Sequence, residues 1–241
     1  MVEELKPALS PRGIEKSGRV LKAFSLLYVP FYGLSPSVVF DHLGTFGVIS
    51  AAVYDADERN ETPSIVRRPN LRWLRAFLKR RRLLDPTIAR YLRDGERWLA
   101  FERRYLRQGA RGLQDTLCAM RWRSSDFRIL HTALLRLVQL REELRIFEAF
   151  AALEFLMEVD DDISSFNRDR LAGHFNFVSA LLELFGADYA ATLGTIRGRA
   201  LTDLRAYRKG LRPQERERFA RTVRTYFTLV PEPKLANGAA T

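Results

Sequence analysis

The chain has 241 residues, of which 46% are hydrophobic, so it can bury a sizeable core, which argues against global disorder. Cys118 is its only cysteine, which excludes a disulfide framework and a cysteine-based zinc site. The 40 lysines and arginines outnumber the 29 acidic residues and give a formal net charge of +11, which favours an anionic partner. Nucleic acid, a membrane surface and a phosphorylated small molecule all satisfy that charge, and so does a solvated arginine-rich surface without any partner.

The sequence carries no sign of membrane insertion or export. No apolar run approaches the roughly 20 residues that span a bilayer. The opening stretch MVEELKPALSPRG lacks the charged and apolar regions of a signal peptide. We therefore expect a cytoplasmic protein without a transmembrane segment, while peripheral contact with a membrane and a homodimer both stay open.

The pattern of apolar residues predicts an all-α protein. Residues 1–20 are expected to be loosely ordered, residues 21–230 to form a single all-α domain of roughly eight to ten helices, and residues 231–241 to be a disordered tail. No stretch alternates polar and apolar residues as a strand would. The expected helical stretches are 32–61, 71–117 with a boundary near Pro86, 124–140, 141–170, 175–186, 188–210 and 212–230.

Two acidic clusters follow apolar helical stretches. The first is YDADERNE, in which Asp57, Glu58 and Glu61 are ordered acid-acid-x-x-acid. Residues i and i+4 share a helix face, so Asp57 and Glu61 can reach one point. Acids also end apolar helices simply because solvent begins there, and either cluster alone has that simpler interpretation.

The second cluster is EVDDDISSFNRD. Asp161, Ser165 and Asp169 stand at i, i+4 and i+8, which places them within about 80° of one another on a helix, and Asp162 adds a carboxylate beside them. Carboxylate and hydroxyl oxygens suit a hard cation such as Mg²⁺. Like charges along one stripe repel, which is the reason to expect a cation. The run of three aspartates leaves the register among Asp160, Asp161 and Asp162 open.

These stretches resemble a known family. DDISSFNRD is similar to the second metal motif of class I terpene synthases, which spaces Asn or Asp, Ser or Thr, and Glu four residues apart; Asp161, Ser165 and Asp169 take those places. The following LAGHFNFV resembles the Gly-x-x-Asn segment that trails this motif in bacterial members. DERNE resembles the family's first, aspartate-rich motif, with glutamates at two of its acidic positions.

The resemblance implies a helical bundle of the class I isoprenoid synthase type around a central pocket. It also implies three Mg²⁺ ions held by the two clusters, and a prenyl diphosphate that is ionised to pyrophosphate and a carbocation on the way to a terpene. Such an enzyme is a carbon–oxygen lyase acting on diphosphates. Arginine pairs well with phosphate oxygens. The candidates for contact with the diphosphate are Arg123, Arg128, Arg168 and Arg224, together with Tyr226, which with Arg224 loosely resembles the family's Arg-Tyr pair.

Two other functions stay open. A chain-elongating prenyl synthase or prenyltransferase on the same fold would carry an Arg-Arg pair after the first motif, which Arg67 and Arg68 resemble, although Pro69 follows where that family has glycine. A basic nucleic-acid-binding protein would use the arginine-dense stretch 67–82. That stretch also has an ordinary apolar face, so we expect a solvated helix there and no nucleic acid partner.

Overall fold

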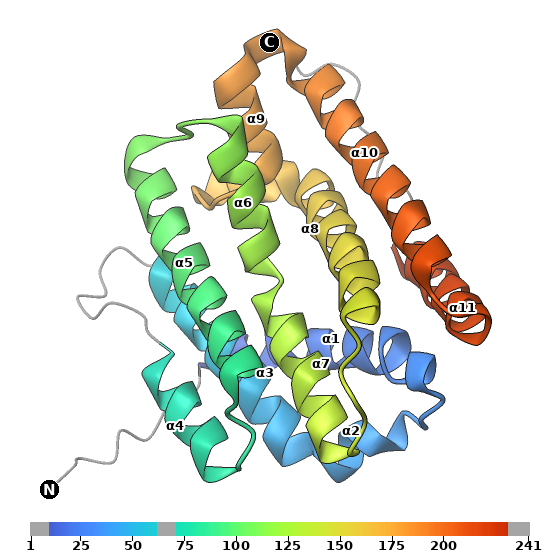
Figure 1. The fold of residues 1–241 in the computed structure, drawn as a ribbon. Helices are drawn as coiled ribbons and strands as arrows, with labels where there is room; N and C mark the ends of the chain where they lie inside the picture. The colour runs from blue at the N-terminus through green and yellow to red at the C-terminus, as the bar shows by residue number, and fades with distance from the viewer. Residues whose placement is uncertain (1–9, 62–70, 231–241) are drawn as a thin grey trace, which may run out of the picture. The chain divides into compact units, whose positions relative to one another are not determined.

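The structure, a computed structural model, describes residues 10–61 and 71–230, without the side chain of Glu61. Over these ranges the chain is helical and contains no strand, which confirms the all-α prediction. The described residues form eleven α-helices and two short 3₁₀-helices (Figure 1). They are α1 (Pro11–Leu27), η1 (Pro30–Tyr32), α2 (Ser37–Asp41), α3 (Leu43–Glu61), α4 (Arg72–Arg80), α5 (Pro86–Gln108), α6 (Leu113–Arg123), α7 (Ser125–Leu137), α8 (Leu144–Ala172), α9 (Phe177–Phe185), η2 (Gly186–Asp188), α10 (Tyr189–Gly210) and α11 (Pro213–Leu229).

The chain divides into two compact units, where we expected a single domain over residues 21–230. Unit 1 comprises Met1–Arg103 and Trp122–Glu143, and unit 2 comprises Arg104–Arg121 and Leu144–Thr241, as far as these ranges are described. Helices α5 and α6 each contribute residues to both units. The first acidic cluster therefore belongs to unit 1 and the second to unit 2.

Residues 11–20, which we expected to be loosely ordered, form the first part of α1. Ser10 is the N-cap of this helix, and its hydroxyl accepts a hydrogen bond from the backbone N–H of Gly13 at 2.9 Å. Pro11 occupies the first turn, where its missing N–H costs nothing. Residues 1–9 and the predicted tail, 231–241, lie outside the described residues.

The stretch 32–61, predicted as one helix, is divided in the structure. Gly33 follows η1 with a φ of 72°, a left-handed conformation that glycine adopts without steric cost. The five-residue helix α2 then ends at His42, and α3 begins directly after it. Gly44 in the first turn of α3 has low helix propensity, which helps to explain why the two helices do not continue into one.

An aromatic cluster joins α1, α3 and α7 in the core of unit 1. The ring of Phe24 stacks on Tyr28 with centroids 5.1 Å apart and meets Phe46 of α3 at 5.6 Å. Tyr28 stacks in turn on Phe127 of α7 at 5.7 Å. All four side chains are buried. Burial of such rings is among the largest contributions that a small core makes to stability, so this cluster holds α3 and its acidic end against α1.

A histidine is fully buried beside that cluster. The imidazole of His131 on α7 is hydrogen-bonded to the hydroxyl of Tyr32, and its ring meets the edge of Tyr28 with centroids 5.1 Å apart. Burial lowers the pKa of His131 from 6.5 to about 3, because the charged imidazolium is poorly solvated there. The ring therefore stays neutral in the folded protein under conditions where the unfolded chain is protonated.

This histidine makes the protein sensitive to mild acid. Between about pH 6.5 and pH 3 the unfolded chain binds one proton more than the folded protein at His131, so the free energy of unfolding falls as the pH falls, by about 1.4 kcal/mol per pH unit. Urea unfolding at about pH 7 and pH 5 measures this. We expect His131→Gln to lose about 2 kcal/mol less than the wild type over that interval. Parallel profiles for the two proteins would contradict this assignment.

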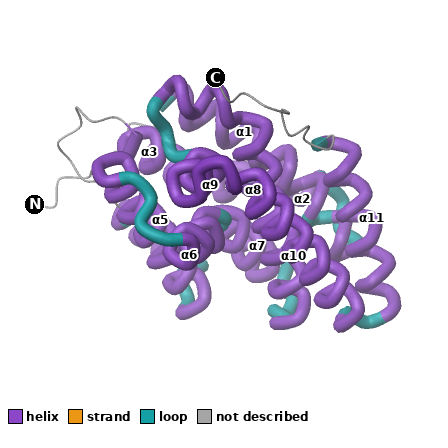
Figure 2. Tube along the Cα trace, turned by 90° about the horizontal axis from the view of Figure 1, so that it is seen from above, coloured by secondary structure: helices purple, strands orange, loops and turns teal. Residues whose placement is uncertain are grey.

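Helix α8 is the central element of unit 2. It contacts α9 and α10, which also contact each other, and the three lie side by side in both ribbon views (Figures 1 and 2). Phe150 on α8 meets Phe219 of α11 edge to face, with ring centroids 5.4 Å apart. The apolar half of α8 is therefore core, and its acidic half carries the candidate site.

One described stretch, Phe177–Gly210, is long and apolar enough to cross a membrane by length and composition alone, where the sequence analysis expected none. The 3₁₀-helix η2 interrupts it at Gly186–Asp188. Core helices of soluble proteins meet the same criterion, so a membrane-spanning role does not follow from it.

Candidate functional site

The three adjacent aspartates of α8 point in three directions. Successive residues of an α-helix are about 100° apart, so each carboxylate meets different surroundings. Asp160 and Asp162 are buried, with exposed fractions of 1% and 0%, whereas Asp161 is exposed. Of the three, only Asp161 presents its side chain to solvent, and its role as the metal ligand stays a prediction.

Asp160 is held by two side chains from later helices. The guanidinium of Arg197 on α10 donates from Nε to Asp160 Oδ1 at 2.8 Å, and the hydroxyl of Tyr226 on α11 donates to Asp160 Oδ2 at 2.9 Å. Burial, and then the charge of Asp160, raise the pKa of Tyr226 well above its usual range, so the phenol stays a hydrogen-bond donor. These contacts give Asp160, for which the sequence suggested no role, a structural one.

Arg224 and Tyr226, both predicted as contacts to the diphosphate, lie on different faces of α11. Two residues along a helix lie about 200° apart, and accordingly Arg224 is exposed while Tyr226 is buried. The arginine that shares a partner with Tyr226 is Arg197, from another helix. Nothing in the sequence singles out Arg197, which is one of 40 basic residues and lies in no motif.

Asp162 joins α8 to the start of α9. Its carboxylate Oδ2 accepts the backbone N–H of Phe177 at 2.7 Å, and its backbone carbonyl accepts the side-chain amide of Asn176 at 2.8 Å. An anion at the first turn of a helix also interacts favourably with the helix dipole. One oxygen of the Asp162 carboxylate therefore anchors α9, and its predicted role as a metal ligand stays a prediction.

Ser165, Asp169 and Asn176 form one hydrogen-bonded group. The hydroxyl of Ser165 donates to Asp169, and the amide nitrogen of Asn176 donates to Asp169 Oδ2 at 3.2 Å and to Ser165 Oγ at 3.3 Å. Burial raises the pKa of Asp169, but hydrogen bonds from Ser165, Asn176 and Arg168 outweigh it, so the pKa lies below its usual value. The carboxylate is therefore ionised at neutral pH.

The loop between α8 and α9 brings Asn176 to this group. Gly173 has a φ of 69°, a left-handed conformation that ends α8, and the N–H of His174 returns to the carbonyl of Asp169 at 2.9 Å. Asn176 is then the N-cap of α9, because its side-chain oxygen accepts the N–H of Val178 at 2.9 Å. This is the segment LAGHFNFV, whose resemblance to Gly-x-x-Asn drew attention to it in the sequence.

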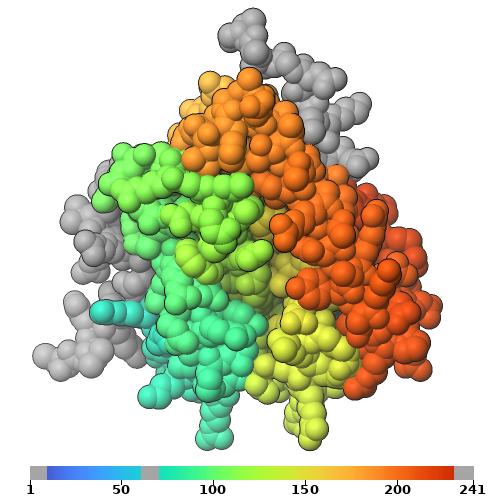
Figure 3. Space-filling model, turned by 45° about the horizontal axis from the view of Figure 1, so that its top comes forward, coloured from blue at the N-terminus to red at the C-terminus, as the bar shows by residue number. Residues whose placement is uncertain are grey.

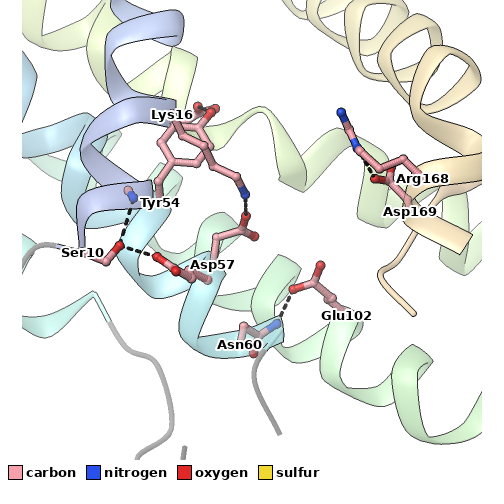
Figure 4. Close-up of polar contacts among 11 residues, drawn as sticks. Ser10, Lys16, Tyr54, Asp57, Asn60, Glu102, Arg168 and Asp169 are labelled. Carbon is pink, nitrogen blue, oxygen red and sulfur yellow. Dashed lines mark hydrogen bonds and ion pairs between the residues drawn. The ribbon is translucent and has the colours of Figure 1, made fainter. Parts of the chain in front are cut away.

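Arg168 lies at the edge of the same group. Its Nε donates to Asp169 Oδ1 at 3.2 Å, and its side chain is 75% exposed (Figure 4). A guanidinium has five N–H donors, so an exposed one that contacts a carboxylate through Nε can still donate hydrogen bonds to a second anion. Of the predicted arginines, Arg168 is the one in unit 2 whose side chain contacts the second cluster.

The first acidic cluster is held by residues of α1. Lys16 Nζ lies 3.3 Å from Asp57 Oδ2 and 5.7 Å from the ring centre of Tyr54, and the hydroxyl of Ser10 donates to Glu58 (Figure 4). Asp57 and Glu58 therefore lie together against α1. Glu61 ends α3, and its side chain lies outside the described residues.

Asn60 attaches the acidic end of α3 to α5. Its side-chain nitrogen donates to Glu102 (Figure 4). The same nitrogen donates to the carbonyl of Leu99 at 3.1 Å, and the side-chain oxygen accepts from Arg103 at 2.7 Å. Asn60 and Glu102 are both buried. Neither residue was predicted to have a role, and the polar group they form fixes the last turn of α3 in place.

The two remaining predicted arginines lie in unit 1. The guanidinium of Arg123 covers the ring of Trp98, with Cζ 5.3 Å from the ring centroid, a cation–π arrangement. Arg128 is partly buried on α7, and its backbone N–H donates to the carbonyl of Ser124. Neither contact tests the predicted diphosphate role, which stays a prediction for both residues.

Within residues 10–61 and 71–230, no three side chains of His, Cys, Asp or Glu are gathered as a metal site. Protein donors hold several of the acids instead, as with Lys16 at Asp57 and Arg197 at Asp160. The oxygen donors Ser165 and Asp169 do lie within hydrogen-bonding distance of each other. Two neighbouring hard oxygens, one of them anionic, are the kind of ligand pair that Mg²⁺ accepts when waters or phosphate oxygens complete its shell.

No protein-family model, no curated protein and no solved structure matches this chain.

Proposed function

We propose that the protein is an Mg²⁺-dependent class I terpene synthase that ionises a prenyl diphosphate, releasing pyrophosphate and forming a terpene through a carbocation. The observation that carries the proposal is the group of Ser165, Asp169 and Asn176. Motif residues from α8 and the asparagine of the following segment meet in one hydrogen-bonded arrangement. A run of acids placed at a helix end only for solubility has no reason to be buried and joined in this way.

The donor set fits magnesium. In unit 2, Asp161, Ser165 and Asp169 would hold it, because they offer only hard oxygens and Asp169 is ionised at neutral pH. In unit 1, Asp57, Glu58 and Glu61 are the corresponding candidates. When bound, Mg²⁺ neutralises the negative charge that develops on a departing diphosphate.

The surrounding residues then have separate tasks. Asn176 orients the carboxylate of Asp169, and Asp162 holds the start of α9 so that Asn176 stays in reach. Arg168 offers its exposed guanidinium to the diphosphate. Lys16 serves as the counter-ion of Asp57 before any metal binds. The departure of a diphosphate needs no general base at the start of the reaction.

A chain-elongating synthase or a prenyltransferase is the alternative on the same chemistry. It ionises the same substrate class but joins the carbocation to a second molecule. The pair Arg67 and Arg68, which suggested it, lies outside the described residues. The products separate the two, because elongation gives a longer diphosphate and cyclisation gives a hydrocarbon or an alcohol.

Incubation of the full chain with Mg²⁺ and geranyl, farnesyl or geranylgeranyl diphosphate tests the proposal. We expect pyrophosphate release with at least one of them, together with an organic product that mass spectrometry identifies, and loss of both when EDTA removes the metal. A folded protein that releases no pyrophosphate from any of the three substrates in the presence of Mg²⁺ would falsify the proposal.

A further inference from the structure

Helix α4 and the turn after it carry a dense group of positive charges. Residues 72–82 hold six basic side chains and no acidic one. Five of the six are exposed and Arg75 is partly buried, where its guanidinium lies 4.0 Å from the carboxylate of Glu96. The apolar residues Leu74 and Leu78 are buried on the opposite face. The six are Arg72, Arg75, Lys79, Arg80, Arg81 and Arg82, which we call the α4 basic patch; blue-green side chains of this segment stand out from the surface in Figure 3.

Two aromatic rings flank the patch. Trp73 and Phe77 are partly exposed and stack on each other, with centroids 5.7 Å apart and planes 18° apart. The guanidinium of Arg81 lies 5.6 Å from the ring centroid of Phe77. An amphipathic helix with Lys and Arg on its polar face and Trp and Phe at its boundary has the composition of helices that lie in a membrane interface.

One arginine of the patch occupies a conformation that favours glycine. Arg82 has a φ of 57°, directly after the end of α4. The N–H of Leu83 returns to the carbonyl of Leu78 at 2.9 Å, the hydrogen bond of a Schellman helix end, where glycine is the usual residue. A side chain in the left-handed region is strained. Arg82 therefore places a charged side chain at a position where the backbone conformation favours glycine.

We propose that the α4 basic patch docks the protein onto the surface of an anionic lipid bilayer. Cations of the patch would contact phospholipid headgroups, and the edges of Trp73 and Phe77 would enter the boundary between headgroups and acyl chains. This goes beyond the proposed function and does not depend on it, since the patch lies outside the acidic clusters.

The rings decide between lipid and nucleic acid as the anionic partner. Single-stranded nucleic acid is bound by open aromatic faces on which bases stack. Here Trp73 and Phe77 use their faces on each other, and Arg81 covers Phe77. A lipid interface requires no open ring face, because an aromatic side chain enters it as an apolar group at the level of the headgroups.

Flotation with vesicles tests the docking. We expect the full chain to float with vesicles of phosphatidylcholine mixed with phosphatidylglycerol, not with phosphatidylcholine alone, and to be released by high salt. The triple variant Lys79→Gln, Arg80→Gln and Arg82→Gly should bind about 100-fold more weakly, at about fivefold for each cation removed near an anionic surface. Its matched control removes three exposed cations from α10 and α11, Arg205→Gln, Arg208→Gln and Arg221→Gln, and should bind like the wild type.

The single variant Arg82→Gly separates binding from folding. Glycine relieves the left-handed strain, so the midpoint of thermal unfolding should rise while vesicle binding weakens about fivefold. Failure of the wild type to bind anionic vesicles would overturn the proposal, as would an equal loss in the two triple variants. A salt-sensitive gel shift of nucleic acid without any vesicle binding would assign the patch to nucleic acid instead.

Discussion

Replacing Asp161 by asparagine is expected to lower Mg²⁺-dependent pyrophosphate release by a factor of about 100 to 1000, the usual effect of removing one group that stabilises developing charge. The side chain is exposed on α8, so its loss should leave the midpoint of thermal unfolding unchanged. Its position four residues before Ser165 and eight before Asp169 is what makes it the candidate ligand among the three aspartates. The measurement is a steady-state assay of pyrophosphate at saturating Mg²⁺.

Two neighbours serve as comparisons for this variant. Asp162→Asn replaces the fully buried, charged acceptor of the Phe177 N–H by a neutral one and buries an additional N–H donor, so it should lower stability by about 1–3 kcal/mol, in contrast to Asp161→Asn. Ser164→Ala and Ser165→Ala form a matched pair: Ser164 is exposed and donates only to the backbone carbonyl of Asp160, whereas Ser165 is buried against Asp169. We expect only Ser165→Ala to reduce turnover. Full pyrophosphate release by Asp161→Asn would show that Asp161 is not a ligand.

Replacing Arg197 by methionine is expected to cost about 3–5 kcal/mol of stability, because it leaves the carboxylate of Asp160 buried without its cation. For a chain of this length the midpoint of thermal unfolding should fall by about 10 °C. The same replacement at Arg199, which is exposed on the same helix, should change it little. Differential scanning calorimetry of the two variants makes the comparison.

The double variant Arg197→Met and Asp160→Leu should recover much of the loss, since it removes both charges and leaves apolar groups that can pack. Tyr226→Phe removes only the hydrogen bond to Asp160 and should cost about 1–2 kcal/mol. If Arg197→Met is as stable as the wild type, or if the double variant is as unstable as the single one, the ion pair does not anchor the acidic half of α8.

The sequence predicted the structure best where the prediction depended on residues within a single helix. The helical period predicted the all-α class, and the spacing of Ser165 and Asp169 placed them on one face, where they hydrogen-bond. It could not say which aspartate turns outward, because that depends on Arg197, 37 residues after Asp160, and on Tyr226, 66 residues after it. The closeness of Arg224 and Tyr226 in the sequence also did not reveal that α11 presents them on different faces.

The same limit applies to the first cluster. Its acids were recognised from their spacing, but Lys16 and Ser10, which hold Asp57 and Glu58, precede them by about 40 residues or more and belong to a stretch that we expected to be loosely ordered. The N-cap at Ser10 is a local signal that was available in the sequence SPRG. Recognising that helix start would have brought α1 into the fold but not its contacts with α3.

The arrangement of the three aspartates in α8 also constrains how this segment can change over evolutionary time. Because each successive residue turns by about 100°, inserting one residue ahead of Asp160 would rotate all three carboxylates at once and would move Asp160 and Asp161 into the places of their next neighbours. Asp160 would become exposed, and Asp162 would leave the start of α9. A substitution in α8 therefore changes one of these contacts at a time, whereas an insertion between Phe150 and Asp160 would have to be compensated in three places together.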